Sequence, residues 1–189
     1  MKKVAVYLGS CPGNSKEYGD VAYRLGRKLA EMNAVMIYGG SNVGTMKSLA
    51  DGALGGGGLV YGVFPKGFKG HSERNFSTDE LIRQDVTHLV MAKDMADRKK
   101  RMSELCTCCV ILPGGWGTMD ELFGHMVQRT TGVHSKPVFI LDFNGFYDPL
   151  KAQFEKMVQE GFIPGGEAAL PVFCDTIEDL VSKIAALPE

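Results

Sequence analysis

The chain has 189 residues, of which 24 are glycine and only 8 are proline. The glycines follow no three-residue period, and 44% of the residues are hydrophobic against 23% charged, so the composition excludes a collagen-like fibre and a disordered chain. A formal net charge of -1 gives no bulk electrostatic attraction to nucleic acid or to an acidic membrane, and neither is an expected partner. At this length we expect one domain that spans residues 1–189.

Short apolar runs alternate with amphipathic segments along the whole chain. In chain order the predicted strands are Val4–Leu8, Ala34–Tyr38, Leu59–Phe64, Val86–Ala92, Cys106–Leu112, Pro137–Leu141 and Val172–Cys174. The predicted helices are Ser15–Met32, Val43–Leu54, Met95–Leu105, Thr118–Thr130, Tyr147–Glu160 and Ile177–Leu187. This alternation predicts an α/β fold, with a doubly wound, mainly parallel sheet covered by helices on both faces. The longest irregular segment, residues 65–78, has a length typical of functional or mobile loops.

The N-terminus and the cysteines indicate a cytoplasmic protein. The apolar run after Lys2 and Lys3 is too short for a signal peptide, and no stretch of about 18 apolar residues is available to span a membrane. An odd number of cysteines does not suit a disulfide framework. Cys106, Cys108 and Cys109 are best interpreted as buried strand thiols, because the four histidines are scattered along the sequence and no cysteine pair elsewhere has zinc-ligand spacing.

Three glycine-rich segments follow predicted strands, at residues 9–14, 39–45 and 113–118. In a doubly wound sheet all three loops emerge at the carboxyl edge, where ligands bind at the topological switch point. Glycine lets the backbone approach a ligand closely, and a following helix offers free N–H groups, so the three loops together favour a phosphorylated ligand. Thr45 and Met46 stand where a Walker motif requires Lys-Ser/Thr, and no Gly-x-Gly-x-x-Gly follows the first strand. Of the phosphorylated ligands considered, a nucleoside monophosphate or a sugar phosphate is therefore the expected one.

The helix expected after the third loop carries a carboxylate that has two interpretations. In one, Thr118 caps the helix and Glu121 occupies the capping-box position three residues later, and the spacing alone favours this interpretation. In the other, Glu121 is held beside a phosphate loop, where it orients water or stabilises a cationic transition state.

A second charged segment covers residues 93–102, just after the fourth predicted strand. Such a run usually forms a solvated helix face. However, cations near a helix start oppose the helix dipole, so Arg98 and Lys99 also suggest an anionic partner. The sequence leaves solvent and ligand equally open here.

These segments together resemble the LOG ("lonely guy") family of cytokinin riboside 5'-monophosphate phosphoribohydrolases, which are often labelled lysine-decarboxylase-like. Residues 113–121 (Pro-Gly-Gly-Trp-Gly-Thr-Met-Asp-Glu) resemble the family signature Pro-Gly-Gly-x-Gly-Thr-x-x-Glu, and Met95 to Lys99 resemble its Met-x-x-Arg-Lys motif. Weaker matches, which include Gly9-Ser10, Gly39-Gly40 and Gly145-Phe146-Tyr147, extend the similarity over nearly the whole chain.

The resemblance implies a Rossmann-like fold, a homodimer, and hydrolysis of the N-glycosidic bond of AMP-type nucleotides to a free base and ribose 5-monophosphate. Carried onto this sequence, Arg98 and Glu121 match the catalytic pair. The expected phosphate- and nucleotide-binding residues are Gly9, Ser10, Gly39, Gly40, Met95, Lys99, Gly114, Gly115, Gly117 and Thr118. This chemistry requires neither a cofactor nor a metal, and no feature marks a lysine that would hold the pyridoxal phosphate of a decarboxylase.

Three departures from the family pattern lie around these motifs. The family commonly has His where Ala96 stands, a third glycine where Ser41 stands, and Trp-Ala-Gln-Leu-Gly at residues 128–132. Because none falls on Arg98 or Glu121, they concern substrate identity more than reaction type. A non-catalytic nucleotide or cofactor carrier of the same fold is the main alternative, and a redox or metal protein built on the clustered cysteines is a more distant one.

Overall fold

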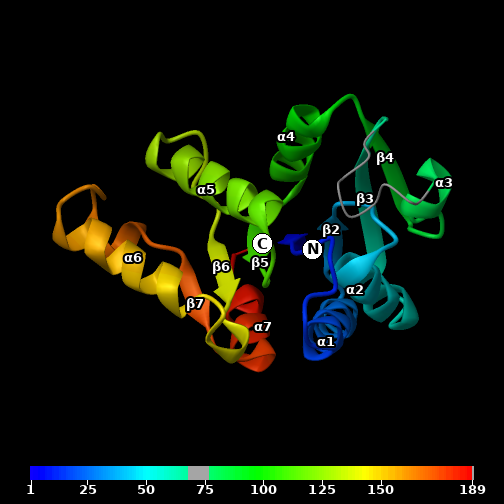
Figure 1. The fold of residues 1–189 in the computed structure, drawn as a ribbon, viewed down its shortest axis with the longest axis horizontal. Helices are drawn as coiled ribbons and strands as arrows, with labels where there is room; N and C mark the ends of the chain where they lie inside the picture. The colour runs from blue at the N-terminus through cyan, green and yellow to red at the C-terminus, as the bar shows by residue number, and fades with distance from the viewer. Residues whose placement is uncertain (68–76, 189) are drawn as a thin grey trace.

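The computed structural model describes residues 1–67 and 77–188, in which a single parallel sheet forms the centre of the molecule (Figure 1). Its strands are β1 (Lys3–Tyr7), β2 (Val35–Tyr38), β3 (Leu59–Pro65), β4 (His88–Ala92), β5 (Cys108–Ile111), β6 (Val138–Leu141) and β7 (Val172–Cys174). They lie in the order β4-β3-β2-β1-β5-β6-β7, and every neighbouring pair is parallel. The predicted α/β class and parallel sheet are confirmed.

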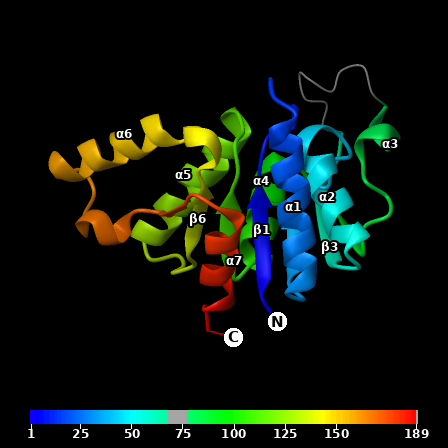
Figure 2. The ribbon, with the colours of Figure 1, turned by 90° about the horizontal axis from the view of Figure 1, so that it is seen from below.

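Helices cover both faces of this sheet. They are α1 (Glu17–Glu31), α2 (Gly44–Gly55), α3 (Thr78–Leu81), α4 (Met95–Leu105), α5 (Trp116–Thr130), α6 (Asp148–Gln159) and α7 (Ile177–Ala185), with short 3-10 turns η2 (Phe143–Gly145) and η3 (Gly166–Ala169). Helices α1, α2 and α7 lie on one face, while α4, α5 and α6 lie on the other (Figures 1 and 2). No helix in the described part of the chain is long and apolar enough to cross a membrane.

The central strand β1 explains why the sequence showed continuous apolar runs. Val4 and Val6 pack into the core beneath α1, α2 and α7, whereas Ala5 and Tyr7 pack into the core on the opposite face. All four side chains are buried, since a parallel strand with helices on both faces has no solvent-facing side. Burial on both sides therefore replaces the polar–apolar alternation of a half-exposed strand.

The strand order also fixes the location of a crevice. From β1 the chain moves outward through β2, β3 and β4, and then returns to place β5 on the other side of β1. The chain therefore leaves β1 toward α1 on one face of the sheet and leaves β5 toward α5 on the other, and a crevice opens between the two connections at the carboxyl edge.

The differences from the predicted elements are small and lie mostly at their ends. Helix α4 and strand β7 have the predicted bounds, whereas β5 begins at Cys108 because Cys106 is the C-cap of α4. Helix α3 and the two 3-10 turns were not predicted. Within the segment predicted to be irregular, Pro65 ends β3 and Thr78 begins α3, and residues 68–76 lie outside the described residues.

Candidate active site

The three glycine-rich loops meet at the carboxyl edge, as the sequence predicted. The N–H of Gly9 donates a hydrogen bond to the carbonyl of Pro113 at 3.2 Å, which joins the loops after β1 and β5. The hydroxyl of Thr45 donates to the carbonyl of Gly9 at 2.6 Å, which joins the loop after β2 to the same group. Between the loops lies a cavity of about 490 Å³. Of the predicted residues, its lining includes Gly9, Ser10, Gly39, Met95, Arg98, Gly114, Gly115, Gly117, Thr118 and Glu121.

The first turn of α5 forms one wall of this cavity. The helix begins at Trp116 with Gly115 as its N-cap, and no side chain makes a capping hydrogen bond there. The interpretation of Thr118 and Glu121 as a capping box is therefore wrong, because Thr118 already lies inside the first turn. The opening N–H groups of α5 have no acceptor within the helix, and Gly115, Gly117 and Thr118 place them at the cavity. This arrangement is a ready-made site for an anion.

Glycine is required at two positions of the lining by close contact. A Cβ atom on Gly114 would lie 2.1 Å from the hydroxyl of Thr118 and 2.9 Å from the backbone nitrogen of Gly9. A Cβ on Gly39 would lie 2.2 Å from Nη2 of Arg98. Any side chain at these positions would push apart the loops or displace the guanidinium, so the two glycines serve close packing around the cavity.

Arg98 and Glu121 form a buried ion pair at the floor of the cavity. Helix α4 begins after Asp94, whose carboxylate caps it by accepting from the N–H of Asp97 at 2.8 Å. This start places Arg98 on the inner face of α4, where Nη1 lies 2.9 Å from Oε1 of Glu121 on α5. The Nε–H of Arg98 also donates to the carbonyl of Val63 at 3.2 Å. Only 9% of Arg98 and 7% of Glu121 is exposed, so their charges face each other in a poorly solvated site.

Burial raises the pKa of the Glu121 carboxyl to about 7, although the positive charge of Arg98 acts in the opposite direction. Desolvation disfavours the ionised form, and the single guanidinium bond offsets this only in part. Near neutral pH the carboxyl therefore exists in both protonation states. Such a group is suited to proton transfer and to stabilising a positive charge.

Two predicted residues, Lys99 and Gly40, are not among the described residues that line the cavity. The ammonium of Lys99 lies 2.6 Å from Oδ2 of Asp120, and 38% and 58% of these side chains are exposed. Gly40 lies behind the lining, where its carbonyl accepts from the N–H of Arg83 at 3.0 Å. The charged segment thus divides: Arg98 points into the site and Lys99 into solvent.

Sequence reasoning missed most of the apolar wall. Tyr18, Met46, Phe64 and Phe146 line the cavity, and Tyr18 packs edge-on against Phe146 with ring centroids 6.1 Å apart. Trp116 stands at the rim with 92% of its surface exposed. Met46, Phe64 and Phe146 fall within the weaker family matches, but none of them was expected in the site, and Tyr18 resembles an ordinary core residue in the sequence, because no spacing rule marks a pocket wall.

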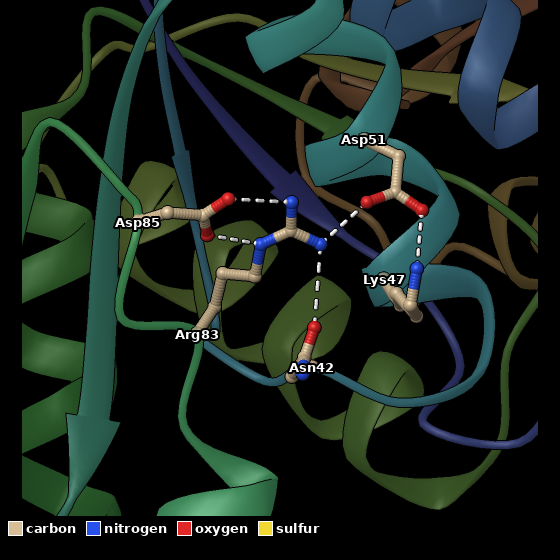
Figure 3. Close-up of polar contacts among 5 residues, drawn as sticks. All are labelled: Asn42, Lys47, Asp51, Arg83 and Asp85. Atoms are coloured by element: carbon tan, nitrogen blue, oxygen red, sulfur yellow. Dashed lines mark hydrogen bonds and ion pairs between the residues drawn. The ribbon is translucent and has the colours of Figure 1, made fainter.

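A second arginine cluster braces the loop after β2 from outside the cavity (Figure 3). The guanidinium of Arg83 donates to both carboxylate oxygens of Asp85, to Asp51 on α2, and to the side-chain oxygen of Asn42 at 3.2 Å. Lys47 also pairs with Asp51 at 2.6 Å. The network ties the segment before β4 to helix α2 and to the second glycine loop.

The clustered cysteines are buried thiols, as predicted: Cys106 and Cys109 lie in the core beneath α4 and α5, whereas Cys108 lies in the core on the opposite face of the sheet. The sulfur atoms of Cys106 and Cys109 are 3.7 Å apart, and Cys109 lies 3.4 Å from a ring nitrogen of His125. His125 and His134, which are scattered in the sequence, are brought within 3.2 Å of each other. Even so, no group of three or more possible metal ligands occurs among the residues placed by the structure.

Comparisons with known proteins show the family of this chain. Residues 46–184 match a family model described as "possible lysine decarboxylase". The cytokinin riboside 5'-monophosphate phosphoribohydrolase of Rhodococcoides fascians is 36% identical over 97% of this chain and 89% of its own length. An enzyme of the same name from Arabidopsis thaliana is 32% identical over 97% of this chain and 82% of its own. The chain belongs to the LOG family.

Solved structures share the LOG fold at lower sequence identity. The structural-genomics target TM1055 superposes with a TM-score of 0.72 at 23% identity, covering 99% of this chain and 100% of the other. A molybdenum cofactor binding protein from Rippkaea orientalis gives a TM-score of 0.71 at 19% identity, covering 98% and 97%. At these identities the likeness concerns the Rossmann-like fold alone.

The LOG signature can now be placed on the structure. Residues 113–121 run from the end of β5, through the loop that contacts Gly9, into the first two turns of α5. The Met-x-x-Arg-Lys motif is the start of α4. The two motifs lie 23 residues apart at Arg98 and Glu121 and meet through that ion pair. The relatives named above are phosphoribohydrolases, and this chain is a hydrolase of the same family.

Proposed function

We propose that this protein hydrolyses the N-glycosidic bond of nucleoside 5'-monophosphates, either AMP or cytokinin riboside 5'-monophosphates, to a free base and ribose 5-monophosphate. The observation that carries the proposal is the buried Arg98–Glu121 pair beside the N-terminus of α5, where no side chain caps the helix among the described residues. An anion site next to a carboxyl whose pKa is raised to about 7 suits a substrate with a phosphate at one end and a scissile bond nearby.

The start of α5 holds the phosphate in this proposal. Three backbone N–H groups, at Trp116, Gly117 and Thr118, open the helix, and the positive end of its dipole favours a dianion there. Glu121 lies one turn further along the same helix, so a ribose bound by its 5'-phosphate presents C1' to that carboxyl.

Glu121 then acts on the glycosidic bond. Cleavage passes through an oxocarbenium-like transition state, in which positive charge develops at C1' and the ring oxygen. The ionised carboxyl stabilises that charge and accepts a proton from the attacking water. Burial makes the interaction stronger than it would be in water, because no solvent dipoles compete with it.

Arg98 has two roles in this scheme. Its bond to Oε1 keeps part of the Glu121 population ionised, against the effect of burial. Its remaining donors can contact the ribose, the phosphate or the departing base. The bond to the Val63 carbonyl fixes the plane of the guanidinium, which keeps those donors at the cavity.

A cytoplasmic homodimer without a metal or cofactor completes the proposal. The outer face of α5 exposes Trp116, Phe123 and Val127, which offers an apolar surface for a second copy. Lysine decarboxylation is not expected, because no lysine is among the described residues that line the cavity.

The test is release of free base, followed by chromatography, from AMP, other nucleoside monophosphates and isopentenyl-AMP. We expect Glu121→Gln to lower turnover by roughly 10² to 10⁴ with the fold retained, because it removes the base and the charge. Asp120→Asn is the matched control: it makes the same change on the neighbouring, exposed carboxylate and should leave turnover close to wild type. Calorimetric binding of AMP without any base release would instead select a nucleotide carrier.

A further inference from the structure

The hydroxyl of Ser41 is a buried polar group that has no partner among the described residues. Ser41 follows β2, lines the cavity, and is only 2% exposed. Its Oγ forms no hydrogen bond with any of the residues placed by the structure, although the neighbouring Thr45 hydroxyl does. A buried hydroxyl that has given up water without gaining another partner destabilises the protein. Such groups in folded proteins usually pair with a bound water or a ligand.

The backbone around Ser41 is fixed on both sides. The N–H of Asn42 donates to the carbonyl of Leu81 at 2.7 Å, and the N–H of Arg83 donates to the carbonyl of Gly40 at 3.0 Å. The guanidinium of Arg83 also holds the Asn42 side chain (Figure 3). Ser41 therefore stays at the cavity, and rotation about χ1 is the freedom left to its hydroxyl.

Ser41 lies on the loop that packs against Arg98, and not on the loop that leads into the proposed phosphate site at α5. It is two residues from Gly39, against which the guanidinium of Arg98 packs. Strand β2 is separated from β5 by β1, which puts the two loops roughly 10 Å apart at normal strand spacing. With the phosphate at α5 and C1' beside Glu121, the group bonded to C1' extends toward the end of the cavity that contains Ser41.

We infer that Ser41 determines base specificity: its hydroxyl pairs with a polar ring or amino atom of an adenine-type base. Met46 and Phe64 also line the cavity, packed against Gly39 and Gly40 just before Ser41, and provide apolar contact for the ring. The orientation of the ligand rests on the proposed hydrolase function. A glycine at this position, as in the family pattern, leaves the base without this hydrogen bond.

The experiment compares the affinities of two ligands by calorimetry in the slow Glu121→Gln background. AMP carries the base, and ribose 5-monophosphate carries only the sugar and phosphate. We expect Ser41→Ala to weaken AMP binding about 3- to 10-fold, the range of one neutral hydrogen bond, and to leave ribose 5-monophosphate binding unchanged. Ser41→Gly should give the same pattern, because it removes the same hydroxyl.

Ser48→Ala is the matched control, since Ser48 lies on α2, where its hydroxyl faces Gly19 of α1, and it is not among the described residues that line the cavity. Thermal melting should show that Ser41→Ala is no less stable than the parent, because the lost hydroxyl bonds to nothing within residues 1–67 and 77–188. Equal weakening of both ligands, or no weakening of either, overturns the inference. Base release by the wild type is scored separately, so a protein that binds AMP through Ser41 but releases no base contradicts the hydrolase proposal alone.

Discussion

Two arginine clusters lie near the same edge of the sheet, and the pKa values of their carboxylates are shifted in opposite directions. Arg98 makes one bond to Glu121, and burial raises the pKa of that carboxyl to about 7. Arg83 binds Asp85 through two bonds, which lower the pKa of Asp85. Burial alone would raise the pKa of Asp51, but hydrogen bonds from Lys47 and Arg83 lower it.

The contrast follows from solvent access and from the number of donors. The side chains of Asp51 and Asp85 are 32% and 64% exposed, while that of Glu121 is 7% exposed. A partly hydrated carboxylate with several donors stays ionised and acts as a brace. A dehydrated carboxylate with one donor is close to protonation at neutral pH. An arginine–carboxylate pair can therefore either brace the fold or take part in proton transfer, depending on how much solvent reaches the carboxylate.

Breaking the buried pair should have the larger effect on stability. Arg98→Met leaves Glu121 without its cation, and we expect a loss of roughly 3 to 5 kcal/mol in the free energy of unfolding at pH 8. The loss should shrink near pH 5, because the raised pKa lets Glu121 take up a proton and avoid an unpaired buried charge. Denaturant titrations at the two pH values measure the difference.

The double variant Arg98→Met with Glu121→Gln is the control for this prediction. It removes both charges, so it should be more stable at pH 8 than Arg98→Met alone, and its stability should depend less on pH. If Arg98→Met loses the same free energy at both pH values, Glu121 is not close to protonation at neutral pH.

The same comparison separates what the sequence could predict from what it could not. Apolar periodicity was sufficient for the strands and for the bounds of α4, because these depend on local pattern. The role of Glu121 was not accessible in this way. Its spacing from Thr118 fits a capping box, and only contact with Arg98, on another helix, reveals burial. Ser41 is similar, since its burial depends on how Leu81 and Arg83 pack over its loop.

Helix α3 gives the opposite lesson. Ser77 and Glu80 form a reciprocal capping box, in which the N–H of Ser77 donates to the Glu80 carboxylate at 2.7 Å and the N–H of Glu80 donates to Oγ of Ser77. The Ser-x-x-Glu pattern is present in the sequence. Thr118 and Glu121 have the capping-box spacing but form no capping box in the structure. Ser77 and Glu80 do form one, although the sequence did not lead us to predict α3. A Ser/Thr-x-x-Glu pattern therefore predicts a helix start only when the tertiary contacts of its residues are also known.

Activity should follow the protonation of Glu121. Because the ionised carboxyl carries the proposed chemistry, kcat/KM should fall up to tenfold per pH unit below about pH 7. The substrate phosphate, with a second pKa near 6, also titrates in this range. Residual activity of Glu121→Gln distinguishes the two groups: its profile should lose the inflection near pH 7 and retain only that of the phosphate. A profile unchanged by Glu121→Gln would assign the inflection to another group.

Breaking the Arg83 network should have the smallest effect on the free energy of unfolding, and this effect should depend on pH over a different range. Arg83→Met removes the bonds to Asp51, Asp85 and Asn42, and we expect a loss of roughly 1 to 2 kcal/mol in unfolding free energy, since these carboxylates regain water. The lowered pKa values of Asp51 and Asp85 stabilise the native state above their ordinary value of 3.8 and cease to do so in stronger acid. The gap between wild type and Arg83→Met should therefore stay constant from pH 5 to pH 8, where the gap for Arg98→Met changes. A gap for Arg83→Met that also varied across neutral pH would mean that the Arg83 carboxylates are as poorly hydrated as Glu121.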